Sequence, residues 1–297
     1  MYAKLQNIKV QPLPHFSSGD IHTDILRLDL LHPVVSGNKW FKLKYYLSEA
    51  LAGNYHTLAS FGGAYSNHIV ATAFAAREAG LTSIGYIRGE KTTPLSPTLR
   101  NAMEYGMKLE YVSREAFRHT ESIMAATADS GIYWVREGGF GTLGAKGAAD
   151  ILSVTDTSSY SHIICAVGTG TMLAGLVQAA LPHQQLVGIS VLKNHFGLEQ
   201  EVGSLLPQKE EQASFTIEQD FHFGGYAKHP QELIRFMQDL WAQEQLPTDI
   251  VYTSKLLYAV KQLLALPYFP AGSRLLLIHS GGLQGNASLP AGTLPFS

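Results

Sequence analysis

Cysteine is almost absent from this chain, and charged residues are sparse. Cys165 is the single cysteine among 297 residues, so no internal disulfide forms and a disulfide-stabilised secreted scaffold is excluded. We therefore expect a protein of the reducing cytoplasm. Charged residues make up 15% of the chain, against roughly 25% in typical soluble domains. The 22 basic and 24 acidic residues leave a net charge of −2, which attracts neither a nucleic-acid backbone nor an anionic membrane.

Long hydrophobic runs and low-complexity tracts are also missing. The longest apolar runs, such as residues 273–278, fall far short of the roughly 20 residues needed to cross a bilayer. Residues 1–10 contain no apolar stretch of the kind found in signal peptides. Disorder is excluded as well, because 45% of the residues are hydrophobic and the net charge is small. We expect a globular protein of about two domains.

The chain instead repeats one local order: a short apolar or β-branched run, a glycine-rich turn, and then an amphipathic segment. Apolar residues at intervals of three and four predict helices, and short bounded apolar runs predict strands. The expected strands cover residues 25–30, 56–61, 81–87, 109–112, 132–135, 162–167, 185–191, 215–219 and 274–279. The expected helices cover residues 39–52, 67–79, 96–105, 114–129, 144–153, 171–181, 199–206, 230–244 and 255–266. This alternation predicts an α/β protein with mostly parallel sheets covered by helices on both faces.

Glycine-rich turns follow several of the expected strands, at Gly62, Gly138, Gly168 and Gly281. Ligands of open α/β sheets bind beyond the carboxyl ends of the strands, so we expect these turns to line one crevice. The alternative is that each glycine serves only a tight turn. No Pro- or Ser-rich linker separates two halves of the chain, which favours one domain inserted within another over two domains in series.

One of these turns predicts a phosphate-binding loop. The expected strand at 162–167 leads into Gly168, Thr169, Gly170 and Thr171, where a helix begins. A helix N-terminus offers unpaired N–H groups and partial positive charge, which suit a phosphate. No lysine follows the glycines as in a Walker A loop, and Leu173 breaks the G-x-G-x-x-G spacing. The alternative is an ordinary glycine turn.

Two lysines stand in the first turn of an expected helix, in Ser36-Gly37-Asn38-Lys39 and at Lys42. A like charge and the positive end of a helix both favour the neutral amine, so they lower a lysine pKa. A neutral amine can attack a carbonyl group and can act as a base. The alternative is a pair of solvated surface lysines.

Five motifs that occur together and in order carry a resemblance to a known family. They are Ser36-Gly37-Asn38-Lys39 with Lys42, Gly62-Gly63-Ala64-Tyr65-Ser66-Asn67-His68, Glu137-Gly138-Gly139, Gly168–Thr171, and His279-Ser280-Gly281-Gly282. The chain resembles the 1-aminocyclopropane-1-carboxylate deaminase and D-cysteine desulfhydrase family. The resemblance implies a pyridoxal 5′-phosphate (PLP) enzyme of the tryptophan synthase β-like fold, an α/β fold of two three-layer domains with mostly parallel sheets. We expect residues 1–52 and 133–297 to form a large PLP-binding domain and residues 53–132 a small inserted domain.

The resemblance also implies which residues surround the cofactor. Lys39 would bind PLP covalently, and Lys42 would help to hold the phosphate in the loop of Gly168, Thr169, Gly170 and Thr171. Asn67 would form a hydrogen bond to the ring hydroxyl. Ser280 would stand near the pyridine nitrogen, where a neutral hydroxyl leaves the ring a milder electron sink that suits elimination. The alternative for Ser280 is a turn residue.

Three further residues would face the substrate. Ser66 stands at an expected helix N-terminus, where a substrate carboxylate is favoured; the alternative is a simple N-cap. Tyr226 and Tyr252 match tyrosines that face the substrate in the family, although a core position is the alternative in a chain with 14 tyrosines. His68 would either edge the cofactor pocket or serve as a hydrogen-bonded structural histidine.

Two positions decide which reaction we expect. Thr253 stands where the cyclopropane deaminases carry a glutamate, and Ser280 stands where they carry an apolar residue. Both differences favour α,β-elimination from D-cysteine to pyruvate, sulfide and ammonia. Lys39 would remove the α-proton, and a tyrosine would protonate the leaving thiol. Three alternatives remain: a 1-aminocyclopropane-1-carboxylate deaminase, another PLP-dependent amino-acid dehydratase, and a PLP-binding protein without catalytic activity.

The expected partners are a small amino-acid substrate and a second copy of the chain, because fold-related enzymes usually form homodimers. The 12 histidines and Cys165 show no metal-ligand spacing, so we expect no metal site. Closure of the small domain would bring Ser66 and Asn67 over the cofactor and exclude water.

Overall fold

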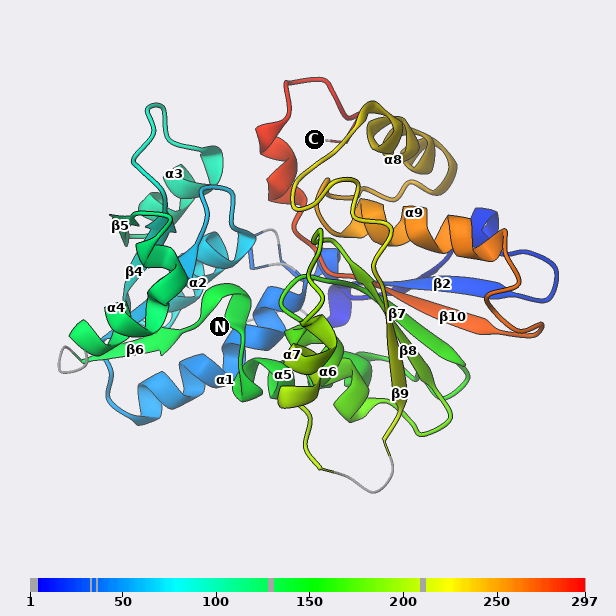
Figure 1. Ribbon diagram of the computed structural model, residues 1–297, viewed down its shortest axis with the longest axis horizontal. Coiled ribbons are helices and arrows are strands. Elements are labelled where there is room, and N and C mark those ends of the chain that lie inside the picture. Colours follow the sequence, from blue (N-terminus) through cyan, green and yellow to red (C-terminus); the bar gives the residue numbers. More distant parts are fainter. Residues whose placement is uncertain (1–4, 33, 36, 128–130, 209–211, 297) are drawn as a thin grey trace.

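The computed structural model describes residues 5–32, 34–35, 37–127, 131–208 and 212–296, and it contains two β-sheets with helices packed around them (Figure 1). Ser36 of an expected motif and residues 128–129 of the expected helix at 114–129 lie outside the described residues. The α/β class with mostly parallel sheets is confirmed.

The larger sheet has six strands in the order β1-β2-β10-β7-β8-β9. Every neighbouring pair is parallel except β1 and β2, which run antiparallel at one edge. The strands are β1 (Val10–Pro12), β2 (His22–Arg27), β7 (His162–Val167), β8 (Gln185–Ser190), β9 (Ser214–Glu218) and β10 (Arg274–His279).

The smaller sheet has four parallel strands in the order β5-β4-β3-β6. They are β3 (Thr57–Gly62), β4 (Thr82–Arg88), β5 (Met107–Val112) and β6 (Ile132–Val135). The segment that forms this sheet lies between two segments that form the larger sheet, which is the order that an inserted domain requires. The expected boundary after residue 132 falls within β6, which pairs with β3 from Thr57 to Ser60. The division into domains stays a prediction.

Helices connect the strands and cover the sheets. They are α1 (Asn38–Ala52), α2 (Asn67–Glu78), α3 (Pro97–Glu104), α4 (Thr120–Ala126), α5 (Thr142–Ala149), α6 (Thr171–Ala179), α7 (Leu198–Ser204), α8 (Gln231–Glu244) and α9 (Thr253–Leu264). None of the helices among the described residues is long and apolar enough to span a membrane.

Alternate residues of β10 divide the core of the larger sheet into two layers. Leu275 and Leu277 are fully buried and pack with residues such as Leu257 of α9. Leu276 points to the other face and packs with residues such as Leu173 of α6. Figure 1 shows α8 and α9 on one side of this sheet and α5, α6 and α7 on the other. Each fully buried leucine contributes roughly 1.5–3 kcal/mol to stability, so both faces hold the sheet.

Three expected elements differ from the structure, and one strand was not expected. The expected helix at 144–153 is α5 only as far as Ala149, because Asp150–Val154 form a 3₁₀ turn. The expected strand at 25–30 is β2, which lies three residues earlier because Leu28–Leu30 form a 3₁₀ turn. The expected helix at 114–129 is interrupted: Ala116–His119 form a 3₁₀ turn, and α4 begins at Thr120 because the φ and ψ of His119 are −121° and 48°. The three-residue strand β1 was not expected from the sequence.

Helices α5 and α6 pack so closely that a glycine is required between them. An added Cβ on Gly175 of α6 would stand 2.3 Å from the carbonyl oxygen of Ala145 in α5. Gly175→Ala should therefore lower the free energy of unfolding by about 1–3 kcal/mol, because overpacking shifts the backbone. Within the part of the chain that the structure describes, an added Cβ on Gly203 of α7 would meet no atom within 4 Å outside its own helix, so the control Gly203→Ala should raise stability by up to about 1 kcal/mol. Urea unfolding measures both, and equal effects would contradict the close helix contact.

Candidate active site

A cavity of about 610 Å³ lies where carboxyl ends of strands from both sheets meet. This volume is within the range of small-molecule and cofactor sites. The turns after β3, β6, β7 and β10 contribute Gly63, Gly138, Gly168 and Gly281 to its wall. Three of the four glycines expected at the crevice therefore line it, and Gly63 stands in place of the expected Gly62. The residues predicted for the site all line it except Thr171, which is fully buried behind the wall.

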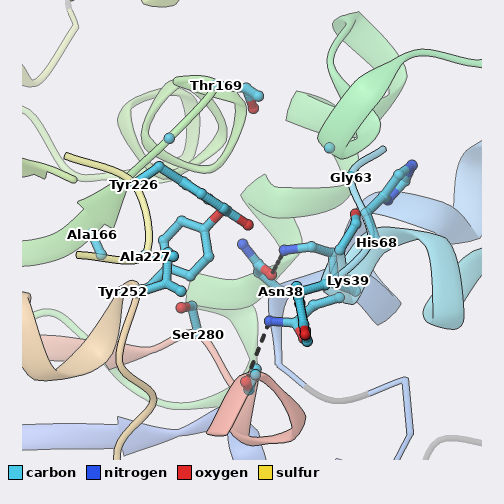
Figure 2. Close-up of a pocket in the computed structure, with 18 of the residues that line it drawn as sticks. Asn38, Lys39, Gly63, His68, Ala166, Thr169, Tyr226, Ala227, Tyr252 and Ser280 are labelled. Atoms are coloured by element: carbon cyan, nitrogen blue, oxygen red, sulfur yellow. Dashed lines mark hydrogen bonds between the residues drawn. The ribbon is translucent and has the colours of Figure 1, made fainter. Parts of the chain in front are cut away.

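Lys39 reaches the cavity from the first turn of α1, and the start of that helix is fixed against the end of β10. The backbone N–H of Asn38 donates to the carbonyl oxygen of Ser280 at 3.2 Å. An added Cβ on Gly37 would stand 1.9 Å from the same oxygen, and the φ of Gly37 is +62°, so only glycine permits this approach. The ammonium group of Lys39 donates to Asn38 Oδ1 at 2.7 Å (Figure 2).

Burial controls the two lysines of α1. It lowers the pKa of Lys39 to about 8, and the charge of Asp249 offsets part of this effect. Burial also holds the pKa of Lys42 well below its usual value, and the charge of Lys39 lowers it further. The sequence predicts lowered pKa values from like charge and the helix N-terminus, whereas burial is the largest cause for both lysines. The Nζ of Lys42 donates to the carbonyl oxygen of Gly138 at 3.1 Å.

The loop between β7 and α6 has the backbone shape of an anion site. Gly170 is the N-cap of α6 with a left-handed φ of +73°, and no side chain caps the helix. The N–H groups of the first turn therefore lack both intrahelical and capping acceptors. An added Cβ on Gly170 would stand 2.7 Å from Val202, so the loop cannot carry a side chain there. The hydroxyls of Thr169 and Thr171 lie 3.0 Å apart.

The start of α2 brings two predicted residues to the cavity. Ser66 is the N-cap, and its hydroxyl accepts from the backbone N–H of Ile69 at 3.4 Å, so the N-cap alternative is confirmed while Ser66 also lines the cavity. Asn67 donates from Nδ2 to the carbonyl oxygen of Gly282 at 3.3 Å. Its Oδ1 is buried and has no hydrogen-bond partner among the described residues, which leaves an acceptor for a ligand donor.

Tyr226 and Tyr252 face Lys39 across the cavity (Figure 2). Their ring centroids lie 6.2 Å apart at 77°, and the Lys39 Nζ lies 5.9 Å from the centroid of Tyr252. Burial raises the pKa of both tyrosines. The interaction between the two hydroxyls raises the pKa of Tyr252 further and offsets part of the rise for Tyr226.

His68 and Ser280 both line the cavity, as the resemblance implies. Thr253, which was used only to choose between the two reactions, does not line it. His68 is buried and forms a hydrogen bond through Nε2 with Ser60 Oγ at 2.9 Å, so both alternatives for this histidine hold. Burial keeps the pKa of His68 well below its usual value, and the charges of Lys39 and Lys42 lower it further. Ser280 is 8% exposed at the end of β10. Thr253 is fully buried.

Two charged residues of the site were missed from the sequence. Asp249 is fully buried, and its carboxylate accepts from the backbone N–H groups of Val251, Tyr252 and Thr253. An aspartate just before a helix is a signal for such a cap. Arg88 ends β4 and lines the cavity, and a position at the carboxyl end of a parallel strand is its signal.

These groups fit PLP. The glycine loop at the start of α6 suits a phosphate, and the unpartnered Oδ1 of Asn67 suits a ring hydroxyl. The Ser280 hydroxyl suits a ring nitrogen that is not fully protonated. The amine of Lys39, partly neutral near pH 8, suits a reactive aldehyde.

Comparisons with known proteins agree with this fit. The profile of the family described as pyridoxal-phosphate dependent enzyme matches residues 6–281. A Thermotoga maritima protein with the provisional name 1-aminocyclopropane-1-carboxylate deaminase is 30% identical over 282 residues, which cover 88% of each chain. A D-cysteine desulfhydrase of Serratia proteamaculans is 26% identical over 87% of this chain and 86% of its own.

Solved structures show the same fold. A crystal structure titled as an ACC deaminase homologue superposes with a TM-score of 0.81 at 25% identity, over 94% of this chain and 90% of the other. An O-ureido-L-serine synthase superposes with a TM-score of 0.70 at 14% identity, over 99% and 95% of the two chains.

The lowered pKa of Lys39 can be measured by its reactivity toward formaldehyde. Because the neutral amine is the reactive form, reductive methylation of Lys39 should rise with pH to a midpoint near pH 8, read by peptide mass spectrometry. Asp249→Asn removes the charge that raises the pKa of Lys39, so the midpoint should move to lower pH. A midpoint at the ordinary lysine value of 10.5 would contradict the burial of this amine.

Proposed function

The chain belongs to the pyridoxal-phosphate-dependent enzyme family, and from this premise we propose that it catalyses α,β-elimination from a small amino acid, with D-cysteine as the substrate that suits the site best. The observation that carries the proposal is the placement of an amine of lowered pKa, Lys39, opposite the tyrosine pair Tyr226 and Tyr252. Elimination needs a base at the α-carbon and an acid at the leaving group.

The chain's own residues divide the work. When bound, PLP supplies an electron sink that stabilises negative charge at the α-carbon. The N-terminus of α2, capped by Ser66, binds the substrate carboxylate, because its N–H groups and partial positive charge favour an anion. Asn67 accepts from the ring hydroxyl of the cofactor. The neutral amine of Lys39 takes the α-proton, and Tyr226 donates a proton to the leaving sulfur. The Gly168–Thr171 loop and Lys42 hold the phosphate.

Two features of the site support elimination over opening of a cyclopropane ring. Position 253 carries a buried threonine, so no carboxylate stands directly after Tyr252. The nearby carboxylate of Asp249 is occupied by three backbone N–H groups. Deamination of 1-aminocyclopropane-1-carboxylate remains the second candidate, because the Thermotoga relative is the more similar of the two relatives, at 30% against 26% identity.

We also propose that the enzyme is a cytoplasmic homodimer in which a small domain closes over the cofactor. The buried free thiol of Cys165 suits a reducing compartment, and closed symmetric dimers are the commonest oligomers. Analytical ultracentrifugation reads the oligomeric state, and a monomer at micromolar concentration would contradict the dimer.

A substrate panel tests the proposed reaction. The holoenzyme should convert D-cysteine to pyruvate and sulfide, with weaker or no turnover of L-cysteine, D-serine and 1-aminocyclopropane-1-carboxylate. Lys39→Ala should lower kcat by a factor of about 10³ or more, because the base is lost. 2-Ketobutyrate from the cyclopropane substrate without sulfide from D-cysteine would reverse the two candidates. Absence of the visible absorbance of bound cofactor after PLP addition would sink both.

The leaving group reveals whether Tyr226 acts as the acid. Tyr226→Phe should lower kcat/KM most for D-serine, less for D-cysteine and least for β-chloro-D-alanine, because chloride leaves without a proton. The expected loss for D-serine is about 10²-fold or more. Tyr65→Phe is the matched control, since Tyr65 also lines the cavity and is exposed to a similar degree, 47% against 44% for Tyr226, but is not part of the tyrosine pair that faces Lys39. It should show no such order. Equal losses for the three substrates would assign Tyr226 to binding alone.

A further inference from the structure

A buried lysine behind the cavity joins the two segments that carry the tyrosines. Lys255 of α9 is fully buried, and its Nζ donates to the carbonyl oxygens of His222 at 2.9 Å and Gly225 at 2.7 Å. Both carbonyls belong to the turn that immediately precedes Tyr226, which we call the 222–225 turn. A buried ammonium group is costly unless it is hydrogen-bonded, so this geometry favours a fixed position of the turn.

The same face of α9 contacts this segment at three successive places. The ring of Tyr252 meets Tyr226 with centroids 6.2 Å apart. Lys255, three residues later, binds the 222–225 turn. Tyr258, three residues further, meets Phe223 with centroids 4.7 Å apart at 76°. Residues three apart share one side of a helix, so α9 presents a ring, an ammonium group and a second ring to one short segment.

The backbone of the segment needs such support. Phe223 and Ala227 have φ values of +54° and +55°, and Gly224 and Gly225 between them have +91° and +122°. Residues with side chains rarely adopt positive φ and keep it only where the surrounding structure holds them. Two backbone carbonyls of the turn accept hydrogen bonds from Lys255 on its buried side. The other side of the turn faces solvent.

We propose that Lys255 is a positioning residue of this site, whose ammonium group holds the 222–225 turn so that Tyr226 faces the cavity beside Tyr252. The role of the positioned hydroxyl as proton donor rests on the proposed function. The position of the turn itself does not.

Hydrogen exchange of the holoenzyme tests the positioning directly. Lys255→Met should speed amide exchange in residues 222–229 by about tenfold or more, because two hydrogen bonds to a charged donor are lost. The matched control is Lys261→Met, a lysine exposed on the same helix, and it should leave that exchange unchanged. Lys255→Gln decides in the same way if the methionine variant does not fold. Unchanged exchange in residues 222–229 would overturn the proposal.

A double-mutant cycle shows whether Lys255 acts through Tyr226. With D-cysteine, Lys255→Met should lower kcat by about tenfold while KM changes little, and it should add no further loss to Tyr226→Phe. A residue that only stabilises the fold would give additive losses, and additivity would overturn the positioning role. If D-cysteine is not turned over by the wild-type enzyme, the proposed function fails, and the exchange experiment still decides the position of the turn.

Discussion

The backbone junction between Gly37 and Ser280 is the constraint on which the site depends. At this junction the first turn of α1 rests on the end of β10, so closely that no side chain fits at position 37. It places Lys39 and Ser280 on one wall of the cavity, although they lie 241 positions apart in the chain. Because α1 leads from the larger sheet into the first strand of the smaller one, the junction also fixes where the smaller sheet begins. A change here would displace the amine from everything it faces.

Burial of cations, more than any single ion pair, gives the site its chemistry. A chain with 15% charged residues places Lys39 and Lys42 in the cavity and Lys255 directly behind its tyrosines. Burial lowers the pKa of each of them, to about 8 for Lys39 and Lys255. A bound anionic ligand would raise these lysine pKa values again, because a nearby negative charge favours the ammonium form. A phosphate and a carboxylate are therefore the natural occupants of this cavity.

The sequence predicted the parts of the fold that depend on local pattern. The limits of β7 and β10 were predicted to the residue, because each is a continuous apolar run between turn residues. β1 has only three residues and is a strand because it pairs with β2. A local sequence pattern does not show such a pairing. The glycine-rich turns indicated where the site lies, because the backbone conformations that they need are visible in the sequence as glycines. Lys255 did not stand out, since a lone lysine is typical of a surface until the distant backbone that it binds is known. Asp249 binds the backbone of the residues directly after it, and its position before a helix was the signal that was missed.

Two parts of the site have different roles in the proposed function: one holds the cofactor, and the other faces the substrate. The loop between β7 and α6 and the start of α1, which we propose hold the cofactor, belong to the fold that this chain shares with an O-ureido-L-serine synthase at 14% identity. Together with the start of α2, the Tyr226 segment and the face of α9 would distinguish substrates in the proposed function. That face follows a simple spacing, Tyr252, Lys255 and Tyr258. In the proposed function, changing these residues would move the proton donor without altering the loop that holds the cofactor phosphate.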